Sequence, residues 1–170
     1  MSEVYFCGDL HICHDGILKH RPQIFTPNGS LITFKDNDHH DLSIVENIAN
    51  TVTKRDTLYI LGDCCFETRG LHLLDLIKCR KFLVLGNHDT CHISEYAKFF
   101  DDVFGFVRYK NFWLSHCPIH PDELWGKINI HGHRHKDSID DEHYINVCLD
   151  QIGHKPMSLT EIKKRIGETK

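Results

Sequence analysis

Apolar and polar residues follow one another along the first half of the chain in the order expected of strands alternating with helices. Three short apolar runs, Val4–Cys7, Thr57–Leu61 and Phe82–Leu85, have the length and composition of buried strands. Apolar residues recur at helical spacing between Leu42 and Val52 and again between Leu71 and Ile77. This half of the chain therefore predicts strands connected by helices.

The second half predicts mostly strands. Asp41 or Ser43 is available to cap the first helix, and Ser158 with Glu161 forms a capping box before a short helix that ends near Ile166. The other predicted elements are a short strand at Leu31–Phe34 among turns, a helix at Glu95–Phe100, and strands at Phe104–Tyr109, Phe112–Ser115, Lys127–His131 and Tyr144–Cys148. The whole pattern predicts an α/β domain with mixed sheets.

The composition is that of one globular domain. The chain has 170 residues, of which 41% are hydrophobic and 26% charged. At about 150 residues per domain, we expect a single domain over residues 1–170. No apolar run reaches the length of about 18 residues that crosses a membrane. The chain starts without a basic segment ahead of an apolar one, so we expect no secretory signal and a cytoplasmic protein.

Charge and cysteine content narrow the function only slightly. Lys and Arg total 20 against 24 Asp and Glu, and no basic stripe of the kind that binds long duplex nucleic acid is evident. The eight cysteines include no Cys-x-x-Cys pair, so we expect reduced, buried thiols rather than disulfides or structural zinc. The 15 histidines are more informative, because histidine is the commonest metal-binding side chain.

Metal-binding side chains directly follow five of the predicted strands. They are Asp9 and His11, then Asp63, then Asn87 with His88 and Asp89, then His116, and finally His133 and His135. Loops beyond strand ends are where α/β folds gather their functional sites. Carboxylate and amide oxygens combined with imidazole nitrogens suit Mn²⁺, Fe or Zn²⁺. In an extended segment alternate residues point the same way, so we expect each Asp-x-His and His-x-His pair to converge.

In this order, the strand-end motifs resemble the calcineurin-like metallophosphoesterase superfamily. The matching segments are Asp9-Leu10-His11, Gly62-Asp63, Gly86-Asn87-His88-Asp89, His116 and Gly132-His133-Arg134-His135. A small bacterial and phage subgroup is similar in the extension of the first motif to His14, in Ile17–Pro22, in His116–Ile119 and in Pro156–Leu159. The resemblance covers almost the whole chain. It implies an αββα sandwich, in which two mixed β-sheets are flanked by helices.

The resemblance also implies a centre of two divalent metal ions. Carried over by position, the ligands are Asp9, His11 and His135 for the first ion, Asn87, His116 and His133 for the second, and Asp63 as the bridge. Paired cations about 3.5–4 Å apart can activate a bridging hydroxide for in-line attack on phosphorus. We expect manganese first, with iron, zinc or nickel as alternatives.

Further residues are candidates for catalysis and for substrate binding. His88 resembles the family's histidine that protonates the leaving oxygen, and Asp89 would orient its imidazole or, alternatively, cap the following helix. Substrate contacts are expected from His14, Arg21, His120 and Arg134. Arginine binds phosphate bidentately, but each of these side chains could equally be solvated or salt-bridged.

These predictions together indicate a metal-dependent phosphoesterase. We expect it to hydrolyse phosphodiesters, phosphomonoesters or both, on a nucleotide or another small phosphoester, because a chain of 170 residues leaves little room for added substrate domains. A nuclease acting on nucleic-acid ends is the alternative within this class. A non-catalytic scaffold of the same fold is the rival outside it, and the unsubstituted ligand set argues against that rival.

Overall fold

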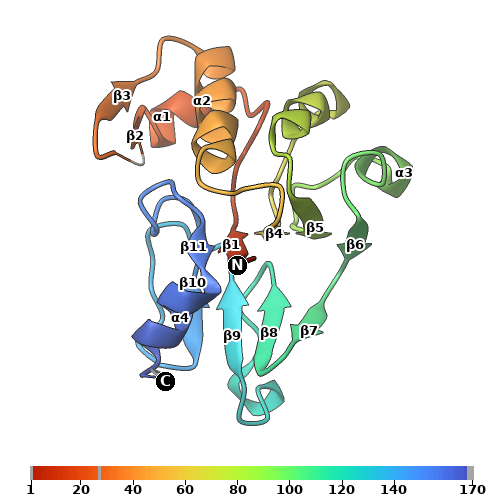
Figure 1. Cartoon of the computed structure of the whole chain (residues 1–170), viewed down its shortest axis with the longest axis vertical. Coiled ribbons are helices and arrows are strands. Elements are labelled where there is room, and N and C mark those ends of the chain that lie inside the picture. Colours follow the sequence, from red (N-terminus) through yellow and green to blue (C-terminus); the bar gives the residue numbers. More distant parts are fainter. Residues whose placement is uncertain (1, 27, 168–170) are drawn as a thin grey trace.

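Two β-sheets packed face to face form the centre of the molecule (Figure 1). The computed structural model describes residues 2–26 and 28–167. The strands of the larger sheet are β1 (Val4–Cys7), β4 (Thr57–Leu61), β5 (Arg80–Val84), β6 (Asp102–Phe104) and β11 (Met157–Ser158). Their order is β11-β1-β4-β5-β6, and all are parallel except β11, which is antiparallel to β1. The carboxyl ends of β1, β4 and β5 therefore share one edge of this sheet.

The smaller sheet also consists mainly of parallel strands. Its strands are β7 (Val107–Tyr109), β8 (Phe112–Ser115), β9 (Ile128–His131) and β10 (Tyr144–Asn146). The order is β10-β9-β8-β7, with β8, β9 and β10 parallel and β7 antiparallel to β8. A separate hairpin pairs β2 (Gln23–Phe25) with β3 (Leu31–Thr33). The carboxyl ends of β8 and β9 also lie at one edge.

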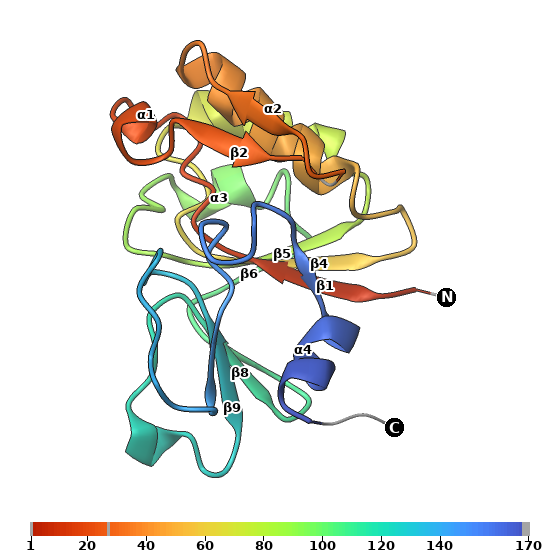
Figure 2. The same cartoon turned by 90° about the vertical axis from the view of Figure 1, so that its left-hand side faces the viewer.

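Helices cover one face of the five-stranded sheet, and the four-stranded sheet covers the other (Figure 2). The helices on that face are α1 (Ile17–His20), α2 (Asn37–Ala49), α3 (Ile93–Tyr96) and the 3₁₀ helix η1 (Thr68–Leu76). On the side of the four-stranded sheet lie α4 (Leu159–Arg165) and the 3₁₀ helix η2 (Pro121–Glu123). None of the helices within the described ranges combines the length and the apolar character needed to span a bilayer.

Two apolar cores hold these layers together. The first lies between the five-stranded sheet, α2 and η1, and it includes the fully buried Ile44 and Leu71. The second lies between the two sheets and α4, and it includes Phe6, Leu114 and Ile162. Because both faces of the five-stranded sheet are covered, its central strands are nearly continuous apolar runs rather than alternating ones.

The outward face of the four-stranded sheet is covered by residues 116–127 in place of a long helix. The backbone N–H of Ile119 donates to Asn129 Oδ1 at 3.0 Å, and the hydroxyl of Tyr144 donates to the Ile119 carbonyl at 2.7 Å. These two bonds tie the segment to β9 and β10. The outer layer on this side is therefore thinner than the helical layer on the opposite side.

The mixed α/β class with two sheets is confirmed, but the first long helix begins earlier than predicted. α2 starts at Asn37 instead of near Asp41. Its cap is Asp36, whose side chain accepts the backbone N–H of His39 at 2.8 Å. The polar residues ahead of the apolar pattern therefore form the first turn of the helix, not a loop.

Three other predicted elements differ in type or extent. The helix predicted at Leu71–Ile77 is the 3₁₀ helix η1, and the helix predicted at Glu95–Phe100 is the single turn of α3. The strand predicted over Phe104–Tyr109 divides at Gly105 into β6 and β7, which belong to different sheets. Within this segment Gly105 marks the point at which the chain passes from one sheet to the other.

Candidate metal centre

The loops that follow β1, β4, β5, β8 and β9 meet at the end of the molecule where the carboxyl ends of these strands lie. They bring together all seven predicted ligands, so that each has a ligand atom within 3.8 Å of a ligand atom of another. The segments concerned are up to about 126 positions apart in the chain. The geometry divides into two halves that share Asp63.

The first half contains Asp9, His11 and His135, whose ligand atoms all lie within 4.8 Å of one another. Asp9 Oδ1 is 3.8 Å from His11 Nε2 and 3.7 Å from His135 Nε2. Asp9 and His11 are buried, whereas the His135 side chain is 46% exposed. Although burial raises the pKa of Asp9, the neighbouring His11 imidazole and the hydrogen bond from the Cys148 thiol lower it below its usual value overall. This half therefore presents one carboxylate and two imidazole nitrogens.

The second half contains Asn87, His116 and His133. His116 Nε2 is 3.0 Å from Asn87 Oδ1 and 3.2 Å from His133 Nδ1. The exposed Cys117 also places its Sγ within 4.8 Å of the ring nitrogens of His116 and His133. Asn87 and His133 are exposed and His116 is buried. The second half is thus more open to solvent than the first.

Asp63 connects the two halves. Its Oδ2 is 3.8 Å from His11 Nε2, and its Oδ1 is 3.4 Å from His116 Nε2. Burial raises the pKa of Asp63, but hydrogen bonds from His116 and from the backbone N–H of His88 outweigh it and lower that pKa to about 2. The carboxylate is therefore ionised at neutral pH, with one oxygen turned towards each half.

Imidazole nitrogens of the site point towards carboxylate and amide oxygens. His116 Nδ1 donates to the Leu61 carbonyl at 2.9 Å, which turns Nε2 towards the Asp63 and Asn87 oxygens. Without metal this Nε2 carries a proton that it donates to Asp63, and a metal ion would take the place of that proton. His11 Nε2 is buried without any hydrogen-bond partner. Converging acceptors of this kind are stabilised by a cation placed between them. The residues present therefore fit divalent metal ions in both halves.

The ligand loops adopt an uncommon backbone conformation. Five of the predicted ligands have positive φ angles: Asp9 (60°), His11 (56°), Asp63 (48°), His133 (69°) and His135 (46°). Such angles are uncommon for residues other than glycine and are concentrated at functional sites. The expectation that the Asp-x-His and His-x-His pairs lie on extended segments is therefore wrong. Their side chains converge because left-handed residues turn the chain sharply around the site.

Two glycines allow these loops to approach one another. A side chain at Gly62, where φ is +81°, would collide with the ring of His116. One at Gly86 would collide with the carboxylate of Asp63. The Gly-Asp and Gly-Asn motifs after β4 and β5 therefore have glycine for steric reasons.

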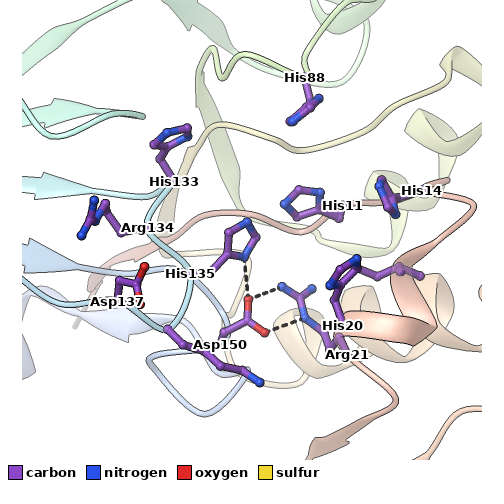
Figure 3. Close-up of a pocket in the computed structure, with 12 residues that line it drawn as sticks. His11, His14, His20, Arg21, His88, His133, Arg134, His135, Asp137 and Asp150 are labelled. Atoms are coloured by element: carbon purple, nitrogen blue, oxygen red, sulfur yellow. Dashed lines mark hydrogen bonds and ion pairs between the residues drawn. The ribbon is translucent and has the colours of Figure 1, made fainter.

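Asp150, which the sequence analysis missed, holds a ligand of the first half in place. Its Oδ2 is 3.0 Å from His135 Nδ1, which leaves His135 Nε2 facing Asp9 (Figure 3). A carboxylate that fixes the tautomer of a metal-binding histidine is a common outer partner in metal sites. The sequence feature that could have identified Asp150 is its position two residues after the strand predicted at Tyr144–Cys148, where the other site residues also follow strands.

Arg21 lies behind Asp150 and does not have the free guanidinium expected of a substrate-binding residue. It is 3% exposed, its Nη2 is 2.7 Å from Asp150 Oδ2, and its Nη groups donate to the carbonyls of Asp9 and Leu10. Although burial raises the pKa of Asp150, His135 and Arg21 together hold it well below its usual range. The geometry assigns Arg21 to positioning Asp150 and the first ligand loop, which corrects the predicted substrate contact.

His88 lies at the mouth of the site, and Asp89 does not touch its ring in the structure. The His88 ring is exposed and stacks on Phe66, with centroids 4.8 Å apart. The Asp89 carboxylate instead accepts the backbone N–H groups of Cys64 and Gly86, both at 2.8 Å. The predicted orientation of His88 by Asp89 is therefore replaced by a different role, since Asp89 fastens the Asp63 and Asn87 loops together. Helix α3 is capped by His92, so the alternative of a helix cap does not hold either.

A cavity of about 600 Å³ opens over the first half of the centre. Its lining includes His11, His88, His133 and His135, and the predicted substrate residues His14 and Arg134 (Figure 3). His120 is outside this lining. Its exposed ring begins η2, where Nδ1 accepts the backbone N–H of Asp122 at 3.3 Å. The structure thus brings two of the four predicted substrate residues to the cavity with free side chains.

Comparisons with known proteins agree with this architecture. The family model of calcineurin-like phosphoesterases matches residues 2–165. The chain is 28% identical to the uncharacterized protein MJ1445 of Methanocaldococcus jannaschii, with 100% of this chain and 94% of the relative covered. It is 30% identical to the gene 66 protein of Mycobacterium phage L5, covering 90% of this chain and 89% of that protein.

A solved structure has the same fold. The crystal structure of the protein of unknown function AQ665 from Aquifex aeolicus superposes with a TM-score of 0.72 at 25% identity, covering 96% of this chain and 99% of that one. The similarity therefore extends over both sheets and the loops between them.

Proposed function

The chain belongs to the calcineurin-like phosphoesterase family, and on that premise we propose that it hydrolyses phosphoester bonds with two divalent metal ions. The observation that carries the proposal is the placement of Asp63. One of its oxygens faces His11 and the other faces His116, so a single carboxylate serves both groups of ligands. Its low pKa keeps both oxygens available at neutral pH.

Bound metal ions would supply a water nucleophile of lowered pKa and would polarise the phosphoryl oxygens. The protein's own contribution is to hold the ligands rigidly. Asp9, His11, His135 and Asp63 would hold one ion, and Asn87, His116, His133 and Asp63 the other. Manganese remains the first expectation, with iron, zinc or nickel as alternatives, because the donors are oxygens and imidazole nitrogens.

His88 is proposed to donate the proton to the leaving oxygen. Its ring lies at the rim of the cavity, 6.1 Å between centroids from the ring of His11, and stacks on Phe66. A histidine near the ligands but not among the closest ligand contacts can approach the ester oxygen from the solvent side. General acid catalysis by such a group contributes about 10²–10⁴-fold to the rate.

The cavity supports a small phosphoester, such as a nucleotide, as substrate. Its volume of about 600 Å³ is much larger than a phosphate group requires, so part of the substrate beyond the phosphate is also enclosed. Arg134 and His14 line it and are proposed to contact the ester. Both phosphomonoesters and phosphodiesters fit this description.

The proposal is tested by reconstitution. Purified protein is stripped of metal, loaded with Mn²⁺, Fe²⁺, Ni²⁺ or Zn²⁺, and assayed on p-nitrophenyl phosphate and bis(p-nitrophenyl) phosphate, with bound metal measured in the same sample. We expect turnover with at least one metal at two ions per chain. Protein that holds two ions and hydrolyses neither ester with any of the four metals would contradict the proposed function.

A further inference from the structure

Three aromatic side chains, two exposed and one half-buried, form a cluster on the outward side of the four-stranded sheet. We call Phe106, Trp113 and Trp125 the aromatic platform. Phe106 stacks on Trp113 with centroids 4.9 Å apart, and Trp125 meets Trp113 edge-on at 6.4 Å. Trp125 is 71% exposed and Phe106 is 48% exposed. Large aromatic rings are usually buried, so a cluster left in solvent indicates a surface that binds something.

The platform is attached to the second half of the metal centre at two points. Trp113 is on β8, three residues before His116, which corresponds to about 10 Å along a strand. Phe106 follows β6, which hydrogen-bonds to the chain two residues before Asn87. In Figure 1 the chain passes from β6 to β7 and returns along β8 beside it. The elements that carry the platform therefore also hold or adjoin two of the second half's ligands.

Two cations flank the rings. Arg108 is directly opposite Trp113 in the β7–β8 register, so both side chains lie on the same face of the sheet. The Nζ of Lys127 lies 5.4 Å from the centre of the Trp113 ring. Within the part of the chain that the structure describes, neither cation forms an ion pair. Arg108 is on β7 and Lys127 directly precedes β9, whereas the acidic Asp122 and Glu123 of η2 come shortly before Trp125 in the chain.

We propose that the aromatic platform stacks the bases of a short single-stranded nucleic acid whose scissile phosphodiester lies at the metal centre. Exposed aromatic rings interleaved with Lys and Arg are the means by which proteins hold single strands without sequence preference. Trp113, about 10 Å along the strand from His116, suits a base adjoining the reacting phosphate. Trp125 precedes the start of β9, at the end away from the ligands, and suits a base further along the strand. The inference rests on the proposed function and names the substrate class of that same site.

The charge of the protein favours a short ligand. The chain carries a net charge of −4, and the cations placed beside the platform are Arg108 and Lys127. Phosphate contacts dominate the binding of long duplexes, which need many cations. Stacking is independent of net charge, so a few nucleotides at a strand end can bind where a duplex does not. The competing occupant of an apolar patch is a second copy of the chain.

The chain provides a direct probe, because its only two tryptophans, Trp113 and Trp125, are both in the platform. Tryptophan fluorescence, excited selectively over that of the five tyrosines, therefore reports on this surface. The metal-loaded enzyme is titrated with phosphorothioate-linked tetrathymidylate and with an abasic strand of the same length and charge. We expect quenching and about 10-fold tighter binding with tetrathymidylate, since stacking is lost only with the abasic strand.

A matched pair of variants separates stacking from folding. Trp125→Ala should remove most of the preference for tetrathymidylate, at about 5–10-fold in Kd, while Trp125→Phe keeps most of it. Hydrolysis of the abasic phosphodiester should be the same in both variants and in the wild type. For tetrathymidylate with ordinary linkages, KM should rise in Trp125→Ala while kcat changes little.

Two results would overturn the inference. One is equal binding of the two strands by the wild type. The other is a wild type that sediments as a dimer and a Trp125→Ala variant that sediments as a monomer, with no base-dependent binding in either, because the platform would then be a self-association surface. Failure of the proposed function is distinguishable, since it would abolish hydrolysis of the abasic strand and of nitrophenyl esters while the fluorescence preference remained.

Discussion

The two halves of the candidate metal centre are built very differently. In the first half, His135 is fixed by Asp150, which is in turn paired with the buried Arg21. The thiol of Cys148 also lies 2.9 Å from Asp9 Oδ2. In the second half, His116 is fixed by a single backbone carbonyl, and Asn87 and His133 are exposed. One half is supported by a buried charged network and the other is not.

This difference predicts that the two halves bind their metal ions with different affinities. Outer partners that fix the orientation of a ligand raise metal affinity, so we expect the first half to bind its ion more tightly. The second half is more open to solvent and adjoins the exposed Cys117, so we expect it to bind its ion more weakly. The mutations below test this comparison, starting with the largest expected effect.

Asp63→Asn should damage both halves at once. The substitution keeps the shape of the side chain but removes the charge that faces His11 and His116. We expect phosphoesterase activity to fall by more than the 10²–10⁴-fold expected for loss of a general acid, together with weaker binding at both metal sites in calorimetric titrations. A variant with full activity and two tight sites would refute the bridging role.

His88→Asn should lower activity while leaving both halves loaded. The ring of His88 is exposed, and the backbone N–H that binds Asp63 is retained in the variant. We expect kcat to fall about 10²–10⁴-fold on esters with poor leaving groups. The fall should be smaller on nitrophenyl esters, because nitrophenolate departs without being protonated. Metal content measured by elemental analysis should be unchanged. Loss of metal would mean that His88 is a ligand instead.

Asp150→Asn should weaken the first half and spare the second. Removing the carboxylate beside His135 should reduce affinity for one of the two ions about 10–100-fold. Isothermal titration should show one weakened site and one unchanged site. Asp137→Asn is the matched control, since Asp137 lines the same cavity but is exposed. Equal weakening of both sites would remove the distinction between the halves.

The Asp150 network should also give the metal-free protein a characteristic pH dependence. The pKa of Asp150 is lowered on folding, so its stabilisation is present above the unfolded-state value of about 3.9 and is lost as the pH falls below it. Breaking a buried ion pair costs about 3–5 kcal/mol. The difference in free energy of unfolding between wild type and Asp150→Asn, from urea titrations, should therefore be largest near pH 6 and shrink towards pH 3. A difference independent of pH would argue against the pairing.

His120→Ala should have the smallest effect. The ring is exposed, lies outside the cavity lining and only begins a short 3₁₀ turn. We expect kcat/KM on nitrophenyl esters and both metal affinities to stay close to those of the wild type, with at most about 1 kcal/mol lost in stability from the altered turn. A large rise in KM would restore His120 as a substrate contact.

The sequence was sufficient to predict the convergence of the ligands. Parallel strands end at one edge, so side chains placed after β1, β4 and β5 had to lie near one another. The family resemblance then predicted which of them would face each half, and family membership is confirmed. The boundaries were less predictable where capping decided them, as at Asp36, whose side chain begins α2 ahead of the apolar pattern.

The support of the site could not be predicted from local patterns. Asp150, Arg21 and Asp41 act across distances in sequence that leave no periodic signal, and Asp41 accepts the backbone N–H of Cys13 from α2. The positive φ angles at the ligands were equally hidden, because residues other than glycine adopt them only when the surrounding structure enforces it. Arg21 and Asp89 were misassigned for this reason, since their partners come from tertiary packing.

The most direct test of the central claim is anomalous diffraction from crystals of the manganese-loaded protein. We expect two peaks on opposite sides of Asp63, one beside Asp9, His11 and His135 and one beside Asn87, His116 and His133. A spacing of about 3.5–4 Å between the peaks would match a two-metal hydrolytic site. A single peak at full metal loading, or two peaks of which only one contacts Asp63, would contradict the account.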